Sequence, residues 1–322
     1  AQTITCSDVQ GGYVGTDNLN VNPLFIDPSV ANFHLQHLSP VIDRCATGQS
    51  VDFDNEARPI TYIRPATPYD MGADEASARV GINNAPCAYG RIQDAVDAAA
   101  SGATIQAAAD VFSETVDIAK TLTIIGGYDV DCTTYMTGTT TVNGGGAGSV
   151  FDITGGTVVL RNLQITGGSG IGAGVDVDGV SQVTLDKTEV TGNNGTYGGG
   201  IYVGPGTVVT LTNDSDVTHN TATIAGGGAR VWGTLVGNET QSDISSNSAP
   251  NGGGVSVPGG TLVLNGSDMA GNHATAADGK GGGIHVYDGG VVTTTHNVWI
   301  YNGHTAYDGA GIYADTTATL YL

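Results

Sequence analysis

Six versions of one short pattern decide the fold: GAGVDV at residues 172–177, GGGIYV at 198–203, GGGARV at 226–231, GGGVSV at 252–257, GGGIHV at 281–286 and GAGIYA at 309–314. Their successive starts lie 26, 28, 26, 29 and 28 residues apart. A second pattern lies between them: Thr188-Glu189-Val190, Ser215-Asp216-Val217, Ser242-Asp243-Ile244 and Ser267-Asp268-Met269. The two patterns stay in step, so this part of the chain is built from one repeated unit.

A unit of this length is too short to bury its own apolar face. Each repeat contains short stretches that alternate apolar and polar residues, such as 208–211 and 262–264, divided by Gly and Asn turns. Stacked coils would share one apolar core and pair their backbones at about 4.8 Å. We therefore predict an all-β fold, a parallel β-helix, and exclude a propeller, whose blades need about 40 or more residues.

An asparagine follows each copy of the second pattern, at Asn193, Asn220, Asn247 and Asn272. Asparagine tolerates the left-handed backbone conformation of a tight turn. Because these residues recur in register, we expect each side-chain amide to bond to the asparagine one coil away.

One helix is expected, over residues 91–100. Ile92, Ala95, Val96 and Ala99 form a single apolar stripe, and Ser101-Gly102 ends the pattern. The end of a solenoid otherwise leaves its core open to water, so we interpret this helix as an N-terminal cap. The sequence thus predicts two parts, an irregular segment over 1–86 and a capped β-helix over 87–322.

Composition narrows the choice of partners. The chain has 322 residues, of which 51 are glycine, and its 31 acidic against 10 basic residues give a net charge of −21. The basic residues are scattered, whereas a phosphate-binding groove needs a basic patch. We expect neither nucleic acid nor an anionic membrane surface as a partner, and without an apolar run of eighteen residues we expect no membrane insertion.

Four cysteines, Cys6, Cys45, Cys87 and Cys132, lack the close spacing of a zinc site. Their even number suits an oxidising compartment. Among the three possible pairings we favour Cys6 with Cys45 and Cys87 with Cys132; free buried thiols are the alternative.

The segment before residue 87 carries the motifs NPLFIDP (22–28), FHL (33–35), SPVID (39–43), DFD (52–54), RP (58–59) and YDMGADE (69–75). It resembles the closing segment of bacterial surface and secreted right-handed β-helix proteins of the pectin-lyase-like superfamily. Residues 87–170, with LTIIGGY at 122–128, resemble the opening of such a protein, and the GGGI and SDV repeats resemble the polymorphic outer-membrane-protein class. The resemblance implies a right-handed helix at the cell surface or outside the cell, and it does not by itself imply catalysis.

The order of these segments is unusual, because a closing segment precedes an opening one. Ser7-Asp8-Val9 matches Ser267-Asp268-Met269, and the last four residues, 319–322, match 261–264. Both ends therefore look like parts of coils, and we expect copies of this unit to continue head to tail, in one long chain or between subunits. A head-to-tail interface that does not close on itself builds a filament.

Two acidic groups are candidate metal ligands. Glu189, Asp216, Asp243 and Asp268 would stack on successive coils, where like charges repel, and bridging Ca²⁺ or simply water and salt would relieve the repulsion. Asp52, Asp54 and Glu56 form an acidic turn that suits either calcium or a solvated loop. Asp176 and Asp178 are interpreted as a solvent-facing loop pair, with metal binding as the alternative.

Four aromatic residues lie at or near the strand that follows the glycine corner: Tyr202, Trp232, Tyr287 and Tyr313. If they face outward they would form a sugar-binding platform, whereas alternation along the strand could also place some of them in the core.

A catalytic site is not expected. Lyases and hydrolases on this fold need converging carboxylates with a basic residue or calcium, and no motif resembling a pectinase site is present. Our first interpretation is a non-enzymatic extracellular or cell-surface structural protein that assembles into a filament or surface layer. The alternatives are an adhesin that binds polysaccharide and, third, a polysaccharide lyase.

Overall fold

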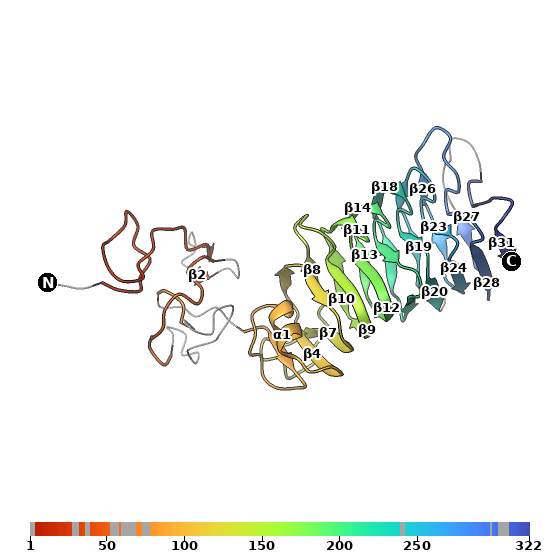
Figure 1. Ribbon diagram of the computed structural model, residues 1–322. Helices are drawn as coiled ribbons and strands as arrows, with labels where there is room; N and C mark the ends of the chain where they lie inside the picture. Colours follow the sequence, from red (N-terminus) through yellow and green to blue (C-terminus); the bar gives the residue numbers. More distant parts are fainter. Residues whose placement is uncertain are drawn as a thin grey trace.

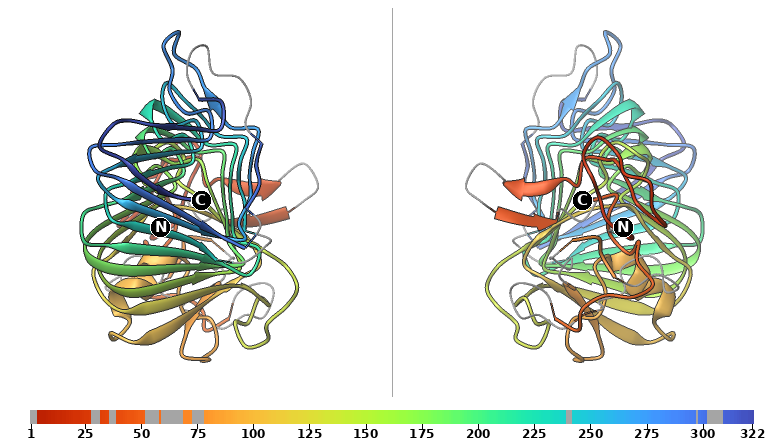
Figure 2. Two further views of the ribbon diagram at one scale, coloured as in Figure 1. Left: turned by 90° about the vertical axis from the view of Figure 1, so that its right-hand side faces the viewer. Right: turned by 90° about the vertical axis from the view of Figure 1, so that its left-hand side faces the viewer.

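The computed structural model describes residues 4–27, 32–35, 39–51, 58, 69–72, 78–238, 242–296, 298–301 and 309–322. It is a parallel β-solenoid of about seven turns, with 48% of residues in strands and one short helix near the N-terminus. Figure 1 shows the coils stacked along one axis, and Figure 2 views them from either end. The all-β parallel solenoid predicted from the repeats is confirmed.

Each full coil contributes strands to up to four stacks. The first face consists of β6 (Val116–Ile118), the start of β9 (Phe151–Arg161), the start of β12 (Val175–Asp186), β15 (Ile201–Val203), β19 (Ala229–Val231), β23 (Val255–Pro258), β27 (Ile284–Tyr287) and β30 (Ile312–Ala314). The second face consists of β4 (Ala103–Ala108), β7 (Leu122–Tyr128), the ends of β9 and β12, β16 (Val208–Thr212), β20 (Thr234–Asn238), β24 (Thr261–Asn265), β28 (Val291–Thr295) and β31 (Thr319–Tyr321).

The third face has eight strands, β5 (Val111–Ser113), β8 (Thr140–Asn143), β10 (Leu163–Thr166), β13 (Glu189–Thr191), β17 (Asp216–Thr218), β21 (Ile244–Ser245), β25 (Met269–Ala270) and β29 (Ile300–Tyr301). A narrower fourth stack contains β11 (Ser169–Ile171), β14 (Asn194–Tyr197), β18 (Thr221–Ala225), β22 (Ser248–Ala249) and β26 (His273–Ala274). Consecutive strands within these stacks pair in parallel, so equivalent residues of successive repeats lie side by side.

One continuous apolar core runs through the coils. Along β19, Ala229 and Val231 point inward and are fully buried, whereas Arg230 between them is only half-buried. The same alternation recurs on neighbouring coils and joins their Val, Ile and Leu side chains in one cluster. Burial of these side chains supplies the main driving force for folding.

The glycine motif is explained by two separate constraints. Its first glycine has a positive φ, for example +61° at Gly198 and +70° at Gly226, which side-chain-bearing residues rarely adopt. Its third glycine faces the next coil: a Cβ on Gly200 would lie 2.6 Å from the carbonyl oxygen of Gly228. The repeated corner therefore needs glycine once for the turn and once for close stacking.

The asparagine ladder expected from the sequence is confirmed. Asn193, Asn220, Asn247 and Asn272 are buried. The Nδ2 atoms of the first three each donate to the Oδ1 atom of the next asparagine, at 3.0 to 3.1 Å. The same amides also donate to backbone carbonyls such as that of Val217, at 2.8 Å. The ladder thus satisfies buried polar groups at the corner while holding adjacent coils in register.

The predicted cap helix is present as α1 (Ile92–Ala98), whose Ile92, Ala95 and Val96 are buried against the first coils. Side chains from the coils hold both of its ends. The Glu114 carboxylate accepts the N–H groups of Ile92 and Gln93, at 2.8 and 3.0 Å, and Lys120 Nζ donates to the carbonyls of Val96 and Ala99. Such contacts satisfy the unpaired groups at helix termini.

β3 (Val80–Ile82) pairs antiparallel with β4 and so joins the solenoid, although it precedes the expected start at residue 87. The irregular segment before it includes β1 (Phe25–Asp27) and β2 (Asn32–Leu35), which pair antiparallel. This segment has a small core of its own, made of Leu35, Val41, Ile42, Cys45 and Met71.

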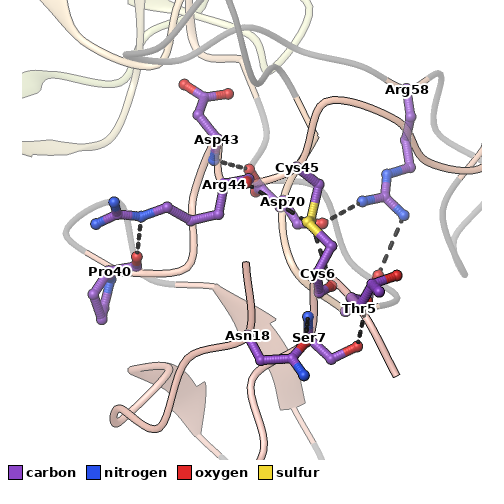
Figure 3. The surroundings of a disulfide bond; sticks show 11 residues. Thr5, Cys6, Ser7, Asn18, Pro40, Asp43, Arg44, Cys45, Arg58 and Asp70 are labelled. Atoms are coloured by element: carbon purple, nitrogen blue, oxygen red, sulfur yellow. Dashed lines mark hydrogen bonds between the residues drawn. A yellow bond between two sulfur atoms is a disulfide. The ribbon is translucent and has the colours of Figure 1, made fainter. Parts of the chain in front are cut away.

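Both favoured disulfides are present, Cys6–Cys45 and Cys87–Cys132, and the described part of the chain has no free cysteine. Figure 3 shows the surroundings of Cys6–Cys45. Beside it the Asp43 N–H donates to the Asp70 carboxylate at 2.7 Å, and Arg58 Nη2 donates to the Asp70 carbonyl at 2.8 Å. The disulfide and these bonds hold together a segment with little regular structure of its own.

Candidate functional site

A continuous row of polar and aromatic side chains runs along the outside of the first face. Strand register places one member on each successive coil, in the order Asp117, Asp152, Asp176, Tyr202, Arg230, Ser256, His285 and Tyr313. We call this set the outer row. Each member lies between two inward-facing residues of its strand, and neighbours are about 4.8 Å apart, the spacing of paired strands.

Further side chains flank the outer row. Tyr287 lies two residues after His285 on β27 and therefore projects from the same face. Trp232 directly follows the end of β19, and its ring centre lies 5.6 Å from the guanidinium carbon of Arg230. Tyr197, on the fourth stack, reaches the row from the other side, because its ring centre lies 4.5 Å from the guanidinium carbon of Arg230. The row is thus bordered by aromatic rings.

The row begins with carboxylates. Asp152 and Asp176 pair in register, and Asp178 projects nearby from β12. Burial raises the pKa of Asp176 to about 7, and the negative charges of Asp178 and Asp152 contribute. Burial likewise raises the pKa of Asp152, with contributions from Asp117 and Asp178. The Oδ1 atom of Asp176 is buried without a hydrogen-bond partner, so burial and the neighbouring carboxylates both disfavour its charged form.

The other end of the row is basic and aromatic. The Arg230 guanidinium lies between the Tyr197 and Trp232 rings, 4.5 and 5.6 Å from their centres. The His285 ring stacks on Tyr287 at 4.5 Å and meets the edge of Tyr313 at 5.4 Å. Burial lowers the pKa of His285 to about 4, and the positive charges of Lys280 and Arg230 add to the effect. His285 is therefore neutral at physiological pH.

The four aromatic residues singled out in the sequence all lie on this face. Tyr202, Tyr287 and Tyr313 are half-buried and Trp232 is 39% exposed, and none belongs to the core cluster. All four side chains therefore lie outside the core, and whether they bind sugar stays a prediction. They do not form one uniform platform, because Arg230, Ser256 and His285 separate Tyr202 from Tyr313 along the row.

The second acidic column also stacks, on the third face. Glu189 and Asp216 pair in register, and the Asp243 N–H donates to the Asp216 carboxylate at 2.9 Å. The N–H of Trp299 donates to Asp268 in the same way, at 2.8 Å. Burial raises the pKa of both Asp216 and Asp243, with the neighbouring carboxylates adding to it. Backbone donors therefore offset part of the repulsion for which calcium was suggested.

Within the described ranges, no three His, Cys, Asp or Glu side chains converge in a way that could hold a metal ion. Asp52, Asp54 and Glu56 lie outside the described residues, so calcium at that turn stays a prediction. The interpretation of Asp176 and Asp178 as a solvent-facing loop pair is wrong in part: both lie in strand β12, where Asp178 is exposed as expected but Asp176 is half-buried.

Sequence reasoning missed five members of the outer row, Asp117, Asp152, Arg230, Ser256 and His285. Arg230, Ser256 and His285 were visible as the variable fifth letter of the glycine motif. Asp117 and Asp152 were not, because β6 and β9 enter the first face without that motif. A comparison of every alternating strand in register, including those without glycine corners, would have found them.

The irregular segment contains a cavity of about 1010 Å³, lined mainly by apolar residues including Pro23, Phe25, Phe33, Leu35 and Met71. The one acidic lining residue, Asp8, already accepts the N–H of Val21 at 3.0 Å. The cavity lacks the converging charged groups of the outer row, so the outer row is the stronger candidate site.

Comparison with known proteins gave no match to a family model, a curated protein or a solved structure. Among the described residues, no helix has the length and apolar character needed to cross a bilayer. Function therefore has to be argued from the solenoid and its outer row alone.

Proposed function

We propose that this chain is an extracellular or cell-surface β-solenoid that binds a glycan along its first face. The supporting observation is the composition of the outer row compared with its counterpart on the second face. One outward column there consists, in register, of Thr123, Val159, Thr184, Thr210, Val236, Val263, Thr293 and Tyr321. Nearly all are β-branched, as strand propensity alone favours.

The outer row is built differently on the same scaffold. Strand geometry and coil spacing are the same on both faces, yet the outer row carries carboxylates, a guanidinium, an imidazole and aromatic rings. Half-buried charges and exposed large aromatic side chains do not help a strand to fold, and gathered on one face they are typical of a binding surface. Aromatic rings offer flat apolar faces for sugar rings, and the polar groups between them can bond hydroxyls.

The proposed location rests on the two disulfides and the acidic composition. Disulfides persist mainly in oxidising compartments such as the outside of the cell. The pectin-lyase-like resemblance belongs to the same proposal, since right-handed β-helices of that kind are found at the cell surface and outside the cell.

A glycan array followed by titration tests the proposed function. Wild-type protein and Trp232→Ala are compared with the control Trp299→Ala, which removes an exposed tryptophan from the third face instead. We expect Trp232→Ala to weaken binding of the array hits about tenfold, a loss typical of a stacked aromatic group, and Trp299→Ala to leave it unchanged. Absence of binding to every glycan, or equal effects of the two variants, would refute the proposal.

The same ligands also test catalysis. Incubation of each bound glycan with the protein, followed by absorbance of unsaturated uronides and by mass analysis of the products, separates binding from cleavage. We propose binding without cleavage. Turnover that is lost in Asp176→Asn would instead assign the acidic end of the row to a lyase or hydrolase.

Lengthwise self-association is the second candidate, and the regularity of the coil-to-coil contact favours it. The buried ladder of Asn220, Asn247 and Asn272 presents the same donors and acceptors to each following coil. A coil of another copy can continue such a pattern, and stacking of this kind would build a filament. Light scattering across a concentration series, with negative-stain images, tests it; a particle of constant mass without elongation would count against it.

A further inference from the structure

We propose that the basic end of the outer row binds an anionic group carried by the glycan, a carboxylate or a sulfate. This inference rests on the proposed glycan binding and narrows it to acidic sugars. The proposed binding centre consists of Arg230 and Lys280, with Ser256 and His285 between them. We call these four residues the anion site.

The inference rests on two cationic side chains that have no carboxylate partner, those of Arg230 and Lys280. Only 10 of the 322 residues are Lys or Arg, and the net charge is −21, so carboxylate partners are abundant. Arg79, Arg91 and Arg161 have such partners. Within the described structure, neither the Arg230 guanidinium nor the Lys280 ammonium forms an ion pair or donates a hydrogen bond. Both instead lie over aromatic rings, which leaves their N–H groups available.

The two cations lie on different coils, on either side of Ser256 and His285 along the row. Arg230 projects from β19, and Lys280 precedes β27 and places its Nζ atom 5.0 Å from the centre of the Tyr313 ring. The His285 ring lies against the same Tyr313 ring, with 5.4 Å between the ring centres, and the positive charges of Lys280 and Arg230 lower the pKa of His285. Strand register places His285 two coils from Arg230, a separation of about 10 Å. Two consecutive sugar units, one of them with an anionic substituent, can span that distance.

Unsatisfied polar atoms mark the same place. Ser256 is fully buried and its Oγ atom has no hydrogen-bond partner, and the buried Nδ1 atom of His285 has none either. Ser256 lies in register between Arg230 and His285. Buried polar atoms are nearly always bonded in folded proteins, so two neighbouring exceptions beneath unpaired cations are typical of a site that a ligand completes.

The carboxylates at the other end of the outer row favour one orientation of the bound glycan. Asp176 lies two coils before Arg230 in the outer row, and Asp152 lies one coil further away. Repulsion by these carboxylates disfavours an anionic group at their end of the row, whereas neutral hydroxyls can bond there. We therefore expect the acidic sugar at the anion site and neutral or cationic substituents toward Asp176.

Calorimetric titration of wild-type protein with three hexasaccharides tests the inference: a uronic-acid hexamer, a sulfated hexamer and a neutral glucose hexamer. We expect acidic hexamers to bind at least tenfold more tightly than the neutral one, since charge-assisted bonds are the stronger ones. The carboxylated and sulfated arms identify which oxyanion fits. Because exposed charges are screened, acidic but not neutral binding should weaken as salt increases.

Variants locate the site. Arg230→Met and Lys280→Met should each weaken acidic binding about tenfold and neutral binding much less, whereas Arg230→Lys should retain part of the affinity for acidic hexamers. Arg161→Met is the matched control, because it removes the same charge from the second face, where Arg161 pairs with Asp186 at 2.6 Å. Melting curves verify that each variant is folded.

The outcomes separate this inference from the proposed function. If neutral and acidic hexamers bind equally well, or if the double variant Arg230→Met/Lys280→Met binds acidic hexamers like the wild type, the anion site is refuted and glycan binding stands. If no hexamer or array glycan binds, both fail. Selective acidic binding that the double variant abolishes and Arg161→Met preserves supports both.

Discussion

Removing one rung of the asparagine ladder should destabilise the protein far more than the loss of one small side chain suggests. In Asn247→Ala the Asn220 N–H loses its acceptor at 2.9 Å, and the Val217 carbonyl loses a donor at 2.8 Å. Two amide-to-amide bonds, to Asn220 and Asn272, are lost as well. All of these groups lie in the interior of the corner, where water does not replace the missing partner.

The expected magnitude follows from these four bonds. A buried hydrogen bond contributes about 1 kcal/mol net, and leaving a buried donor unpaired costs about 1–3 kcal/mol. In the variant, Asn220 Nδ2 still donates to the Val190 carbonyl, and Asn272 Oδ1 still accepts from the N–H of residue 247. Some of the buried polar groups therefore keep a partner. We expect Asn247→Ala to lower the free energy of unfolding by about 4 kcal/mol.

Urea denaturation followed by circular dichroism and by tryptophan fluorescence measures this change, and coincident transitions would verify two-state behaviour. The control is Asn194→Ala, which removes an exposed asparagine one position after the ladder residue of its own coil. We expect about 0.5 kcal/mol or less there. Asn247→Asp, which places a charge beside the Val217 carbonyl, should be worse than alanine. A difference under about 1 kcal/mol between Asn247→Ala and Asn194→Ala would refute the ladder as a stabilising element.

Three further predictions concern the corner, the outer row and the disulfide. Gly228→Ala should cost about 3 kcal/mol in urea denaturation, because its Cβ would lie 2.8 Å from the Gly254 carbonyl oxygen, whereas Gly206→Ala, with open space and a φ of +79°, should cost about 1 kcal/mol. Asp176 has a raised folded pKa, of about 7, so its unfavourable ionisation reduces stability as pH rises from about 4 to 7; Asp176→Asn should raise the melting temperature at pH 8 and change it little at pH 4. Replacing Cys87 and Cys132 by serine opens a 45-residue loop, for which the chain-entropy model gives a loss of about 4 kcal/mol in the same assay; a loss under about 1 kcal/mol would contradict it.

The interior of the solenoid could be predicted from the sequence, because close stacking of the coils requires the same residue types at equivalent positions. The Gly200 and Gly228 positions must lack a side chain, and the Asn220 and Asn247 positions must supply both a donor and an acceptor toward neighbouring coils. These constraints require the same residue type at the same spacing in successive repeats, so a search for sequence repeats finds them. The cap helix was equally visible, since α1 needs one apolar stripe to cover the first coil.

The outer row could not be predicted in the same way, because the fold does not specify its residues. Asp176, Tyr202, Arg230 and His285 occupy equivalent positions yet share no chemistry, so periodicity treats them as unrelated. The row also begins on β6 and β9, before the glycine motif starts. The register of the folded strands shows that Asp117 and Asp152 continue the row.

This division makes stability and binding separable by experiment. Asn247 lies inside the solenoid, where its amide bonds neighbouring coils and is remote from any ligand on the surface. The side chains of Arg230 and Trp232 project outward. The hydrogen bonds that join these residues to neighbouring coils are made by the backbone, so they survive truncation of the side chain. Inner-ladder variants should therefore lower stability without altering affinity in the folded fraction, and outer-row variants should do the reverse. If Arg230→Met unfolded the protein as readily as Asn247→Ala, the outer row would have to be understood as part of the scaffold, and the reason to regard it as a binding surface would be lost.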